Sequence, residues 1–166
     1  MDKSKIKIQT SLSEVKDPTR RLYQASAVAE ALKEFVESQF PACADVNVGL
    51  EHDGGVMLCA DYLALFVKTI LRSVFGNAFL TIDIKSNDDR LSMLISADKQ
   101  ISIPDSEINK LIRIARNTGF EVEENPAIFT AHIKFISQNE YSVYAINFST
   151  DKKIITSKLC DIFNDK

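Results

Sequence analysis

Hydrophobic positions are most regular between Asp61 and Phe75, in the stretch DYLALFVKTILRSVF. Apolar side chains recur there at the three- and four-residue spacing of one helical face, at Leu63, Phe66, Val67, Ile70, Leu71 and Val74. Lys68 and Arg72 mark a narrow polar side. Asp61 is expected to cap the start of the helix and Gly76 its end. We therefore predict a helix that is covered on most sides and forms the centre of one domain.

The two segments after this helix alternate between apolar and polar residues. Phe79–Lys85 and Arg90–Ser96 each place apolar side chains at every second position, and a polar turn joins them. This pattern predicts two neighbouring antiparallel strands, with the apolar helix packed across them.

The remaining periodic stretches complete the predicted order of elements. Further strands are expected at Lys5–Thr10, Asp45–Glu51, Val56–Cys59, Phe120–Glu123, Ala127–Ser137 and Tyr141–Ser149. Further helices are expected at Thr19–Phe40, Pro104–Asn117 and Ile154–Phe163, with Gly119 ending the second. The turn HDGG is expected to join Asp45–Glu51 and Val56–Cys59 as a hairpin. The order predicts an α+β fold, a two-layer sandwich of helices on a mixed, mostly antiparallel sheet.

The 166 residues contain no internal repeat, low-complexity tract or linker, so we expect a single domain over 1–166. Within it, 1–44 contributes an N-terminal strand and helix, 45–137 the core, and 138–166 an extra strand and the C-terminal helix.

Composition and charge exclude several classes of function. The chain is 45% hydrophobic and 26% charged, with a net charge of −3 and no basic run interleaved with aromatic residues, which argues against nucleic acid as a partner. No stretch is apolar over the length needed to cross a bilayer, and no signal peptide is visible. Cys43, Cys59 and Cys160 are widely spaced, which suits buried thiols in the cytoplasm and gives no metal-site spacing.

The polar residues of this chain give no clear catalytic group. His132 alternates with apolar residues in a predicted strand and is expected to be a sheet-face residue. His52 lies in the HDGG turn, and Asp88 and Asp89 lie in the turn between two strands, where polar residues are common. We therefore predict no catalytic residue, no metal and no cofactor.

The order of elements from Asp45 to Ile136 resembles the ATP-binding domain of histidine kinases and their relatives gyrase, Hsp90 and MutL. Cys59-Ala60-Asp61 is similar to the strand end and the Asp that opens the family's long helix. Leu94–Ile101, LISADKQI, is similar to its adenine-reading turn. Ile108–Gly119, followed by FEVEENPAIFTAHIKFI, is similar to its closing helix, turn and strand pair. The resemblance makes 45–137 a kinase-ATPase-like core.

The residues that handle the nucleotide in this family are replaced. The helix position of the magnesium-holding Asn falls on Phe75, and the family's other common Asn falls on Leu71. Ser96 stands where the family has its adenine-reading Asp, while Asp98 and Gln100 stand where it has glycines. The glycine-rich lid over the phosphates is essentially absent. The resemblance therefore implies a degenerate, pseudokinase-like domain without ATPase or kinase activity.

The resemblance also places a degenerate ligand pocket beside the central helix. Its expected lining residues are Lys68, Leu71, Arg72, Phe75, Ser96, Asp98 and Gln100. We expect Leu71 and Phe75 to fill the former nucleotide space with side chain.

Three functions remain open at this point. The first is a non-catalytic regulatory module of bacterial two-component signalling, which binds a protein partner or a second copy of itself. The second is a protein that binds a nucleotide or another small ligand through altered contacts, with Asp98 as the substitute adenine acceptor. The third is an unrelated α+β domain.

Overall fold

The computed structural model describes residues 15–74, 78–99, 104–123, 129–136 and 148–164. Its helices are α1 (Ala25–Gln39), α2 (Ala60–Thr69), α3 (Asp105–Thr118) and α5 (Phe148–Asn164), with the π-helical segment η3 (Ile70–Val74) directly after α2. Its strands are β1 (Arg21–Gln24), β2 (Ala44–Leu50), β3 (Gly55–Leu58), β4 (Leu80–Ser86), β5 (Arg90–Ala97), β6 (Glu121–Glu123) and β7 (Phe129–Lys134).

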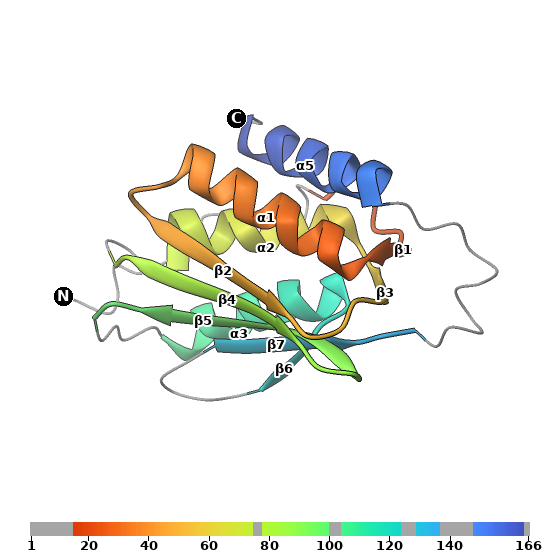
Figure 1. Cartoon of the computed structure of the whole chain (residues 1–166). Helices are drawn as coiled ribbons and strands as arrows, with labels where there is room; N and C mark the ends of the chain where they lie inside the picture. Colours follow the sequence, from red (N-terminus) through yellow and green to blue (C-terminus); the bar gives the residue numbers. More distant parts are fainter. Residues whose placement is uncertain (1–14, 75–77, 100–103, 124–128, 137–147, 165–166) are drawn as a thin grey trace.

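Five strands form one sheet in the order β2-β4-β5-β7-β6 (Figure 1). β2 and β4 are parallel, and the other three neighbouring pairs are antiparallel. β4 and β5 are the two antiparallel strands expected after the central helix, with Ile82 opposite Ile95. The predicted class, α+β with helices on a mixed and mostly antiparallel sheet, is confirmed.

Strand alternation gives this sheet one apolar face. In β4, Leu80, Ile82 and Ile84 are buried, whereas Lys85, between Ile84 and Ser86, is exposed. In β5, Leu91, Met93 and Ile95 are buried in the same way. Because side chains in a strand point alternately to opposite faces, these apolar positions all meet the helices. The opposite face carries mostly polar side chains.

α2 is the centre of the helical layer, as predicted. Leu63, Phe66 and Ile70 are at most 1% exposed. Burying a large apolar side chain in this way contributes about 1.5–3 kcal/mol to folding. The start of the helix differs from the prediction, because Cys59 occupies the N-cap position without a side-chain cap bond and Asp61 lies inside the first turn. Gly76 lies outside the described residues.

α5 packs on the outer side of α1 and α2, so these two helices lie between α5 and the sheet (Figure 1). Small residues make this arrangement possible for α1, whose buried positions include Ala25, Ala27, Ala29 and Ala31. Short side chains let the helix approach neighbours on two sides. α5 also includes the predicted helix Ile154–Phe163 and begins earlier, at Phe148.

Two predicted boundaries are wrong. The helix expected over Thr19–Phe40 begins only at Ala25, because Arg21–Gln24 forms the short strand β1. The buried Tyr23 and a backbone ladder to β3 stabilise the extended form of this segment. The strand expected over Tyr141–Ser149 lies mostly outside the described residues, and Phe148 and Ser149 begin α5. The strand expected over Lys5–Thr10 also lies outside them.

The predicted hairpin between Asp45–Glu51 and Val56–Cys59 is wrong in its pairing. Both strands exist as β2 and β3, but β3 pairs antiparallel with β1 and β2 pairs parallel with β4. Asp53, in the intervening turn, ties this turn to the start of α1. Its carboxylate accepts the backbone N–H of Ser26 at 2.9 Å and the side-chain amide of Gln24 at 2.7 Å.

The segment after β5 follows the prediction closely. α3 begins directly after Pro104 and ends at Gly119, which has a φ of +124°. Such a left-handed backbone conformation favours glycine. β6 and β7 follow, as an antiparallel pair shorter than the predicted strands.

Candidate functional site

Three residues of the predicted pocket lie on α2 and η3. Lys68 is only 8% exposed and interacts with another group of the protein. Leu71 is half-buried and packs against the hydrophobic core. Arg72 reaches α5, where its guanidinium lies 4.9 Å from the centre of the Phe163 ring and donates to the Phe163 carbonyl at 3.4 Å. The positive side chain of Arg72 is therefore used in packing α5 against α2.

η3 is a feature that the sequence pattern did not predict. Its i→i+5 backbone pattern replaces the α-helical spacing at the point where Leu71 and Arg72 occur. π-helical turns are found frequently at functional sites. They also rotate the residues that follow, so a position counted along an ideal α-helix no longer identifies the same face.

Two other predicted pocket residues lie at the end of β5. Ser96 is opposite Thr81 of β4, and strand alternation places its side chain on the face opposite to the buried Ile95. Asp98 is exposed, and its carboxylate accepts the backbone N–H of Phe79 at 3.0 Å. Both residues lie where β5 ends, beside the start of β4.

Phe75 and Gln100 lie outside the described residues. The pocket as a whole therefore stays a prediction. None of its five described members lines either of the two cavities that follow.

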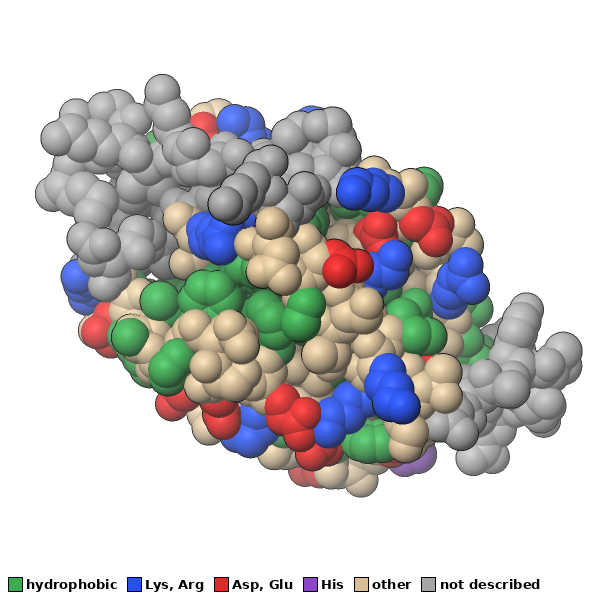
Figure 2. Space-filling model, turned by 90° about the horizontal axis from the view of Figure 1, so that it is seen from above, with side chains coloured by type: hydrophobic (Ala, Val, Ile, Leu, Met, Phe, Trp, Pro, Cys, Tyr) green, Lys and Arg blue, Asp and Glu red, His purple; other side chains and the backbone are tan. Residues whose placement is uncertain are grey.

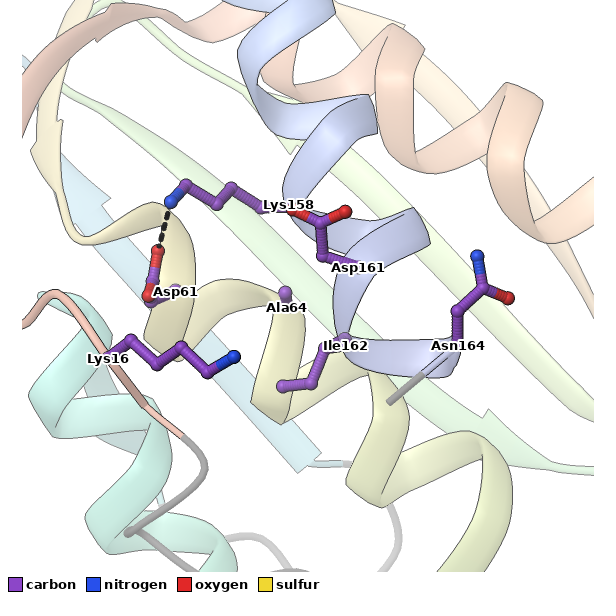
Figure 3. A pocket seen from close by; sticks show the side chains of 7 residues that line it. All are labelled: Lys16, Asp61, Ala64, Lys158, Asp161, Ile162 and Asn164. Atoms are coloured by element: carbon purple, nitrogen blue, oxygen red, sulfur yellow. Dashed lines mark ion pairs between the residues drawn. The ribbon is translucent and has the colours of Figure 1, made fainter. Parts of the chain in front are cut away.

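The larger cavity, of about 360 Å³, lies between α2, α5 and the chain before β1 (Figure 3). Its lining residues are Lys16, Asp61, Ala64, Lys158, Asp161, Ile162 and Asn164. Asp61 and Lys158 form an ion pair of 3.0 Å at one end. Ala64 and Ile162 provide an apolar surface between the charged groups. A second, smaller cavity of about 130 Å³ shares Asp61 and Lys158 with the first.

Asp61 connects three parts of the chain beside this cavity. One carboxylate oxygen meets Lys158 of α5, and the other accepts the backbone N–H of Asp17 at 3.0 Å. The Cys59 thiol donates to the Asp17 carbonyl at 3.3 Å. Burial raises the pKa of this thiol above its ordinary value, so Cys59 is held as a neutral donor. Residues at the start of α2 therefore bind both the backbone N–H and the backbone carbonyl of Asp17.

The cysteines form no disulfide. Cys59 is fully buried, whereas Cys43 is half-buried and Cys160 is exposed on α5, so the expectation of buried thiols is correct only for the first.

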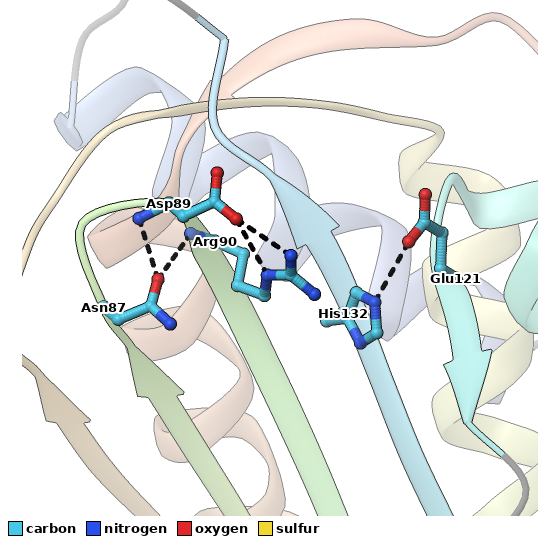
Figure 4. A network of polar contacts seen from close by, with 5 residues as sticks. All are labelled: Asn87, Asp89, Arg90, Glu121 and His132. Atoms are coloured by element: carbon cyan, nitrogen blue, oxygen red, sulfur yellow. Dashed lines mark hydrogen bonds and ion pairs between the residues drawn. The ribbon is translucent and has the colours of Figure 1, made fainter.

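The turn and sheet-face residues behave as ordinary structural groups (Figure 4). Asn87 accepts the backbone N–H groups of Asp89 and Arg90 at 2.8 and 2.9 Å, which fixes the turn between β4 and β5. His132 is buried on the sheet and lies 3.0 Å from the carboxylate of Glu121. Among the described residues, no three His, Cys, Asp or Glu side chains gather into a group that could hold a metal.

Charges of both signs are mixed over the helical face of the molecule, with hydrophobic side chains between them (Figure 2). Nucleic-acid-binding surfaces instead carry a basic patch. None of the helices within the described ranges is both long and apolar enough to cross a bilayer.

Comparison with known proteins finds similarity at the level of structure. No model of a known protein family matches the chain, and no curated protein matches its sequence. The cytoplasmic segment of histidine kinase QseC is similar at a TM-score of 0.45 and 16% identity, over 76% of this chain and 79% of that one. The catalytic domain of histidine kinase ThkA gives a TM-score of 0.45 and 12% identity, over 70% and 97%. The Acinetobacter baumannii histidine kinase AdeS gives 0.40 and 18%, over 73% and 68%.

At these TM-scores the similarities carry no argument about a site, a ligand or an activity. The order and pairing of the elements do describe the fold. β3 leads into α2, β4 and β5 follow as an antiparallel pair, and α3, Gly119 and the β6–β7 pair complete the sheet. This is the order that the resemblance predicted from the sequence. The chain therefore has a histidine-kinase-ATPase-like fold.

Proposed function

We propose that this protein is a non-catalytic, histidine-kinase-like module that regulates signalling through contact with a protein partner or with a second copy of itself. In this role the fold serves as a scaffold for surfaces, and ATP is not used. Its three free thiols suit the reducing cytoplasm.

The position of Asp98 carries this proposal. Asp98 is the acidic residue that remained available as a substitute adenine acceptor. Its side chain is exposed, and its carboxylate accepts the N–H of Phe79. A carboxylate that reads a base must be free to accept from the ligand and be shielded from water, because an exposed hydrogen bond gives little discrimination. Asp98 therefore closes the β4–β5 pair and is poorly placed to orient adenine.

The contacts of Arg72 support the same proposal. A cation beside the helix could have met phosphate groups, but Arg72 lies against the Phe163 ring and bonds the carbonyl of the same residue. Leu71, at one of the family's Asn positions, packs against the core and has no metal-binding atom.

A second candidate function rests on the cavity beside Asp61. Its volume of about 360 Å³ lies at the lower end of the range for small-molecule sites. Lys16 and Asp161 line it together with the ion pair of Lys158. A small ligand that carries both charges, such as an amino acid, would fit this lining.

Calorimetry with magnesium-ATP at about millimolar concentration tests the first proposal. We expect no saturable heat and no release of phosphate, because an unpaired polar contact costs about 1–3 kcal/mol and the metal ligand is also replaced. Asp98→Asn is a matched control, since it should leave this result unchanged. A micromolar affinity would overturn the proposal. Binding that Lys158→Ala abolishes and Asp98→Asn preserves would favour the cavity beside Asp61 as the ligand site.

A further inference from the structure

β2 is the longer of the two edge strands of the five-stranded sheet (Figure 1). Within the described part of the chain, no strand pairs with its outer edge. The opposite edge strand, β6, has only three residues and carries Glu121 and Glu123. Short length and charge are the usual protection of an edge against unwanted pairing. β2 has seven residues and less of this protection.

The hydrogen bonds of neighbouring residues show which backbone groups of β2 point outward. The carbonyl of Cys43 accepts the N–H of Leu80 in β4, so residue 43 faces inward. Backbone groups alternate in direction along a strand, so Val46 and Val48 face outward. The Lys33 ammonium, 2.9 Å from the Val46 carbonyl, agrees with this direction. The N–H and C=O of Val48 have no partner among the described residues.

An exposed aliphatic side chain accompanies this open backbone. Val48 is 38% exposed, and it is the one exposed large hydrophobic side chain among the described residues. Leu50, two residues further along the same face, is half-buried. Open hydrogen-bonding groups next to apolar side chains are the chemistry of strand addition, in which backbone bonds supply affinity and alternate side chains supply specificity.

We propose that β2 pairs antiparallel with β2 of a second copy of this chain across a two-fold axis, which joins the two sheets into one. This inference rests on the proposed function as an interaction module and names the surface that it uses. A two-fold axis requires a surface that is complementary to itself. The sequence of β2 meets that requirement.

The charges of β2 favour the register centred on Asn47 over the register centred on Val48. When the axis passes through Asn47, Val46 and Val48 of one copy lie opposite Val48 and Val46 of the other, and Asp45 lies opposite Gly49. No like charges are then directly opposed. When the axis passes through Val48 instead, Asp45 lies opposite Glu51, and two acidic side chains repel each other.

Lys33 does not prevent the pairing. In the register centred on Asn47, the Val46 carbonyl accepts the N–H of Val48 from the second copy. The Lys33 ammonium then keeps its ion pair with Glu37, which is 2.6 Å away on the same helix. A seven-residue edge buries less area than the roughly 1,200–2,000 Å² of a stable interface. We therefore expect a weak dimer that forms with increasing protein concentration.

Sedimentation equilibrium of the 166-residue chain, up to about 1 mM, measures this association. Val48→Pro removes an outward N–H without touching the ladder to β4, because proline is tolerated at an edge. Each substitution acts twice in a symmetric dimer, so we expect the dissociation constant to rise about tenfold or more. Val48→Thr keeps the N–H and the branched shape and should dimerise within about threefold of the wild type.

Disulfide cross-linking tests the register, in a background with Cys43→Ser and Cys160→Ser. Asn47 would face its own counterpart as a non-hydrogen-bonded pair with Cα atoms about 4.5 Å apart, which a disulfide can span. Asn47→Cys should therefore form a cross-linked dimer under mild oxidation. Asp45→Cys, whose counterpart would lie several residues along the strand, should not.

Three results would overturn this proposal. One is a wild type that stays monomeric at the highest concentration. Another is equal cross-linking of Asn47→Cys and Asp45→Cys. The third is a Val48→Pro variant that melts well below the wild type as a monomer, which would show that another segment of the same chain covers β2. None of these results affects the ATP titration, so the proposed function and this inference fail separately.

Discussion

Lys158 and Asp61 form an ion pair of 3.0 Å that joins α5 to the first turn of α2, and the same carboxylate holds the backbone N–H of Asp17. The Asp61 side chain is 13% exposed, whereas that of Lys158 is 37% exposed. Asp61 is therefore the more buried partner of this ion pair. Replacing Asp61 and replacing Lys158 should change the free energy of unfolding by different amounts.

Asp61→Ala should lower the free energy of unfolding by about 1–3 kcal/mol, because the partly buried N–H of Asp17 loses its acceptor. Lys158→Ala should cost about 0–1 kcal/mol, as is usual for a partly exposed ion pair. Denaturant titration measures both. The amide of Asp17 should also exchange faster in Asp61→Ala.

Lys152→Ala is the matched control, since it breaks a 2.8 Å ion pair between α5 and Glu34 of α1. It should leave the exchange of the Asp17 amide unchanged. An equal exchange rate of the Asp17 amide in the wild type and in Asp61→Ala would contradict the hydrogen bond from this amide to Asp61.

Asp53 should make the protein less stable in acid. Partial burial would raise the pKa of its carboxyl, but hydrogen bonds from Gln24, Ser26 and Gly54 outweigh burial and hold this pKa below its ordinary value. The ionised form therefore stabilises the native state. This stabilisation is fully present above the ordinary pKa of about 3.9 and is lost as the pH falls through the lower native value.

Asp53→Asn should weaken the dependence of the free energy of unfolding on pH below about pH 4. Urea unfolding at successive pH values measures this dependence. Ser26→Ala removes one donor and should produce a smaller loss of the same sign. An unchanged pH dependence in Asp53→Asn would exclude this carboxylate as the source.

Arg72 and Phe163 should be energetically coupled. The guanidinium lies 4.9 Å from the ring centre, a separation at which a cation–π contact contributes about 0.5–1 kcal/mol at an exposed site. A double-mutant cycle with Arg72→Ala and Phe163→Leu should recover a coupling energy of that size. The Lys152–Phe148 pair, at 5.9 Å, should give a smaller value in the same experiment. Zero coupling would mean that the contact of Arg72 with the Phe163 ring does not contribute to stability.

Gly119→Ala should be strongly destabilising. A Cβ atom there would lie 2.9 Å from the Met57 carbonyl oxygen, and the φ of +124° disfavours any L side chain. We expect a loss of more than about 1 kcal/mol, measured by thermal unfolding. Gly49→Ala is the control, because no atom lies within 4 Å of its added Cβ, and it should change stability by less than about 0.5 kcal/mol. Equal melting of the two variants would contradict the structure at Gly119.

The sequence predicted the parts of the fold whose signals are local. α2 and the β4–β5 pair have long, unambiguous periodicities and short connections, and the structure confirms them. Gly119 was predicted to end α3 because glycine is common directly after the last residue of a helix. Local alternation also identified β2 and β3 as strands, but it does not specify which strand each one joins. The partner of β2 is β4, thirty-six residues later in register.

The candidate site was harder to predict for two physical reasons. η3 changes the helical spacing after α2, so counting from Asp61 along an ideal α-helix does not identify the faces of the residues that follow η3. The role of Asp61 beside the cavity depends on contacts with Asp17 and Lys158, which approach it only in the folded state. The orientation of Ser96, in contrast, was readable from strand alternation with Ile95.

The position of α5 has a consequence for how the protein is made. The Asp151 carboxylate bonds the N–H of Gln24, which is 127 residues earlier in the chain. During synthesis on the ribosome, α1 and α2 therefore emerge long before the helix that covers them. Their outer apolar positions remain in contact with water during that interval, and contacts between distant parts of a chain form slowly. A chaperone that shields α1 and α2 until α5 has been translated should therefore raise the yield of native protein.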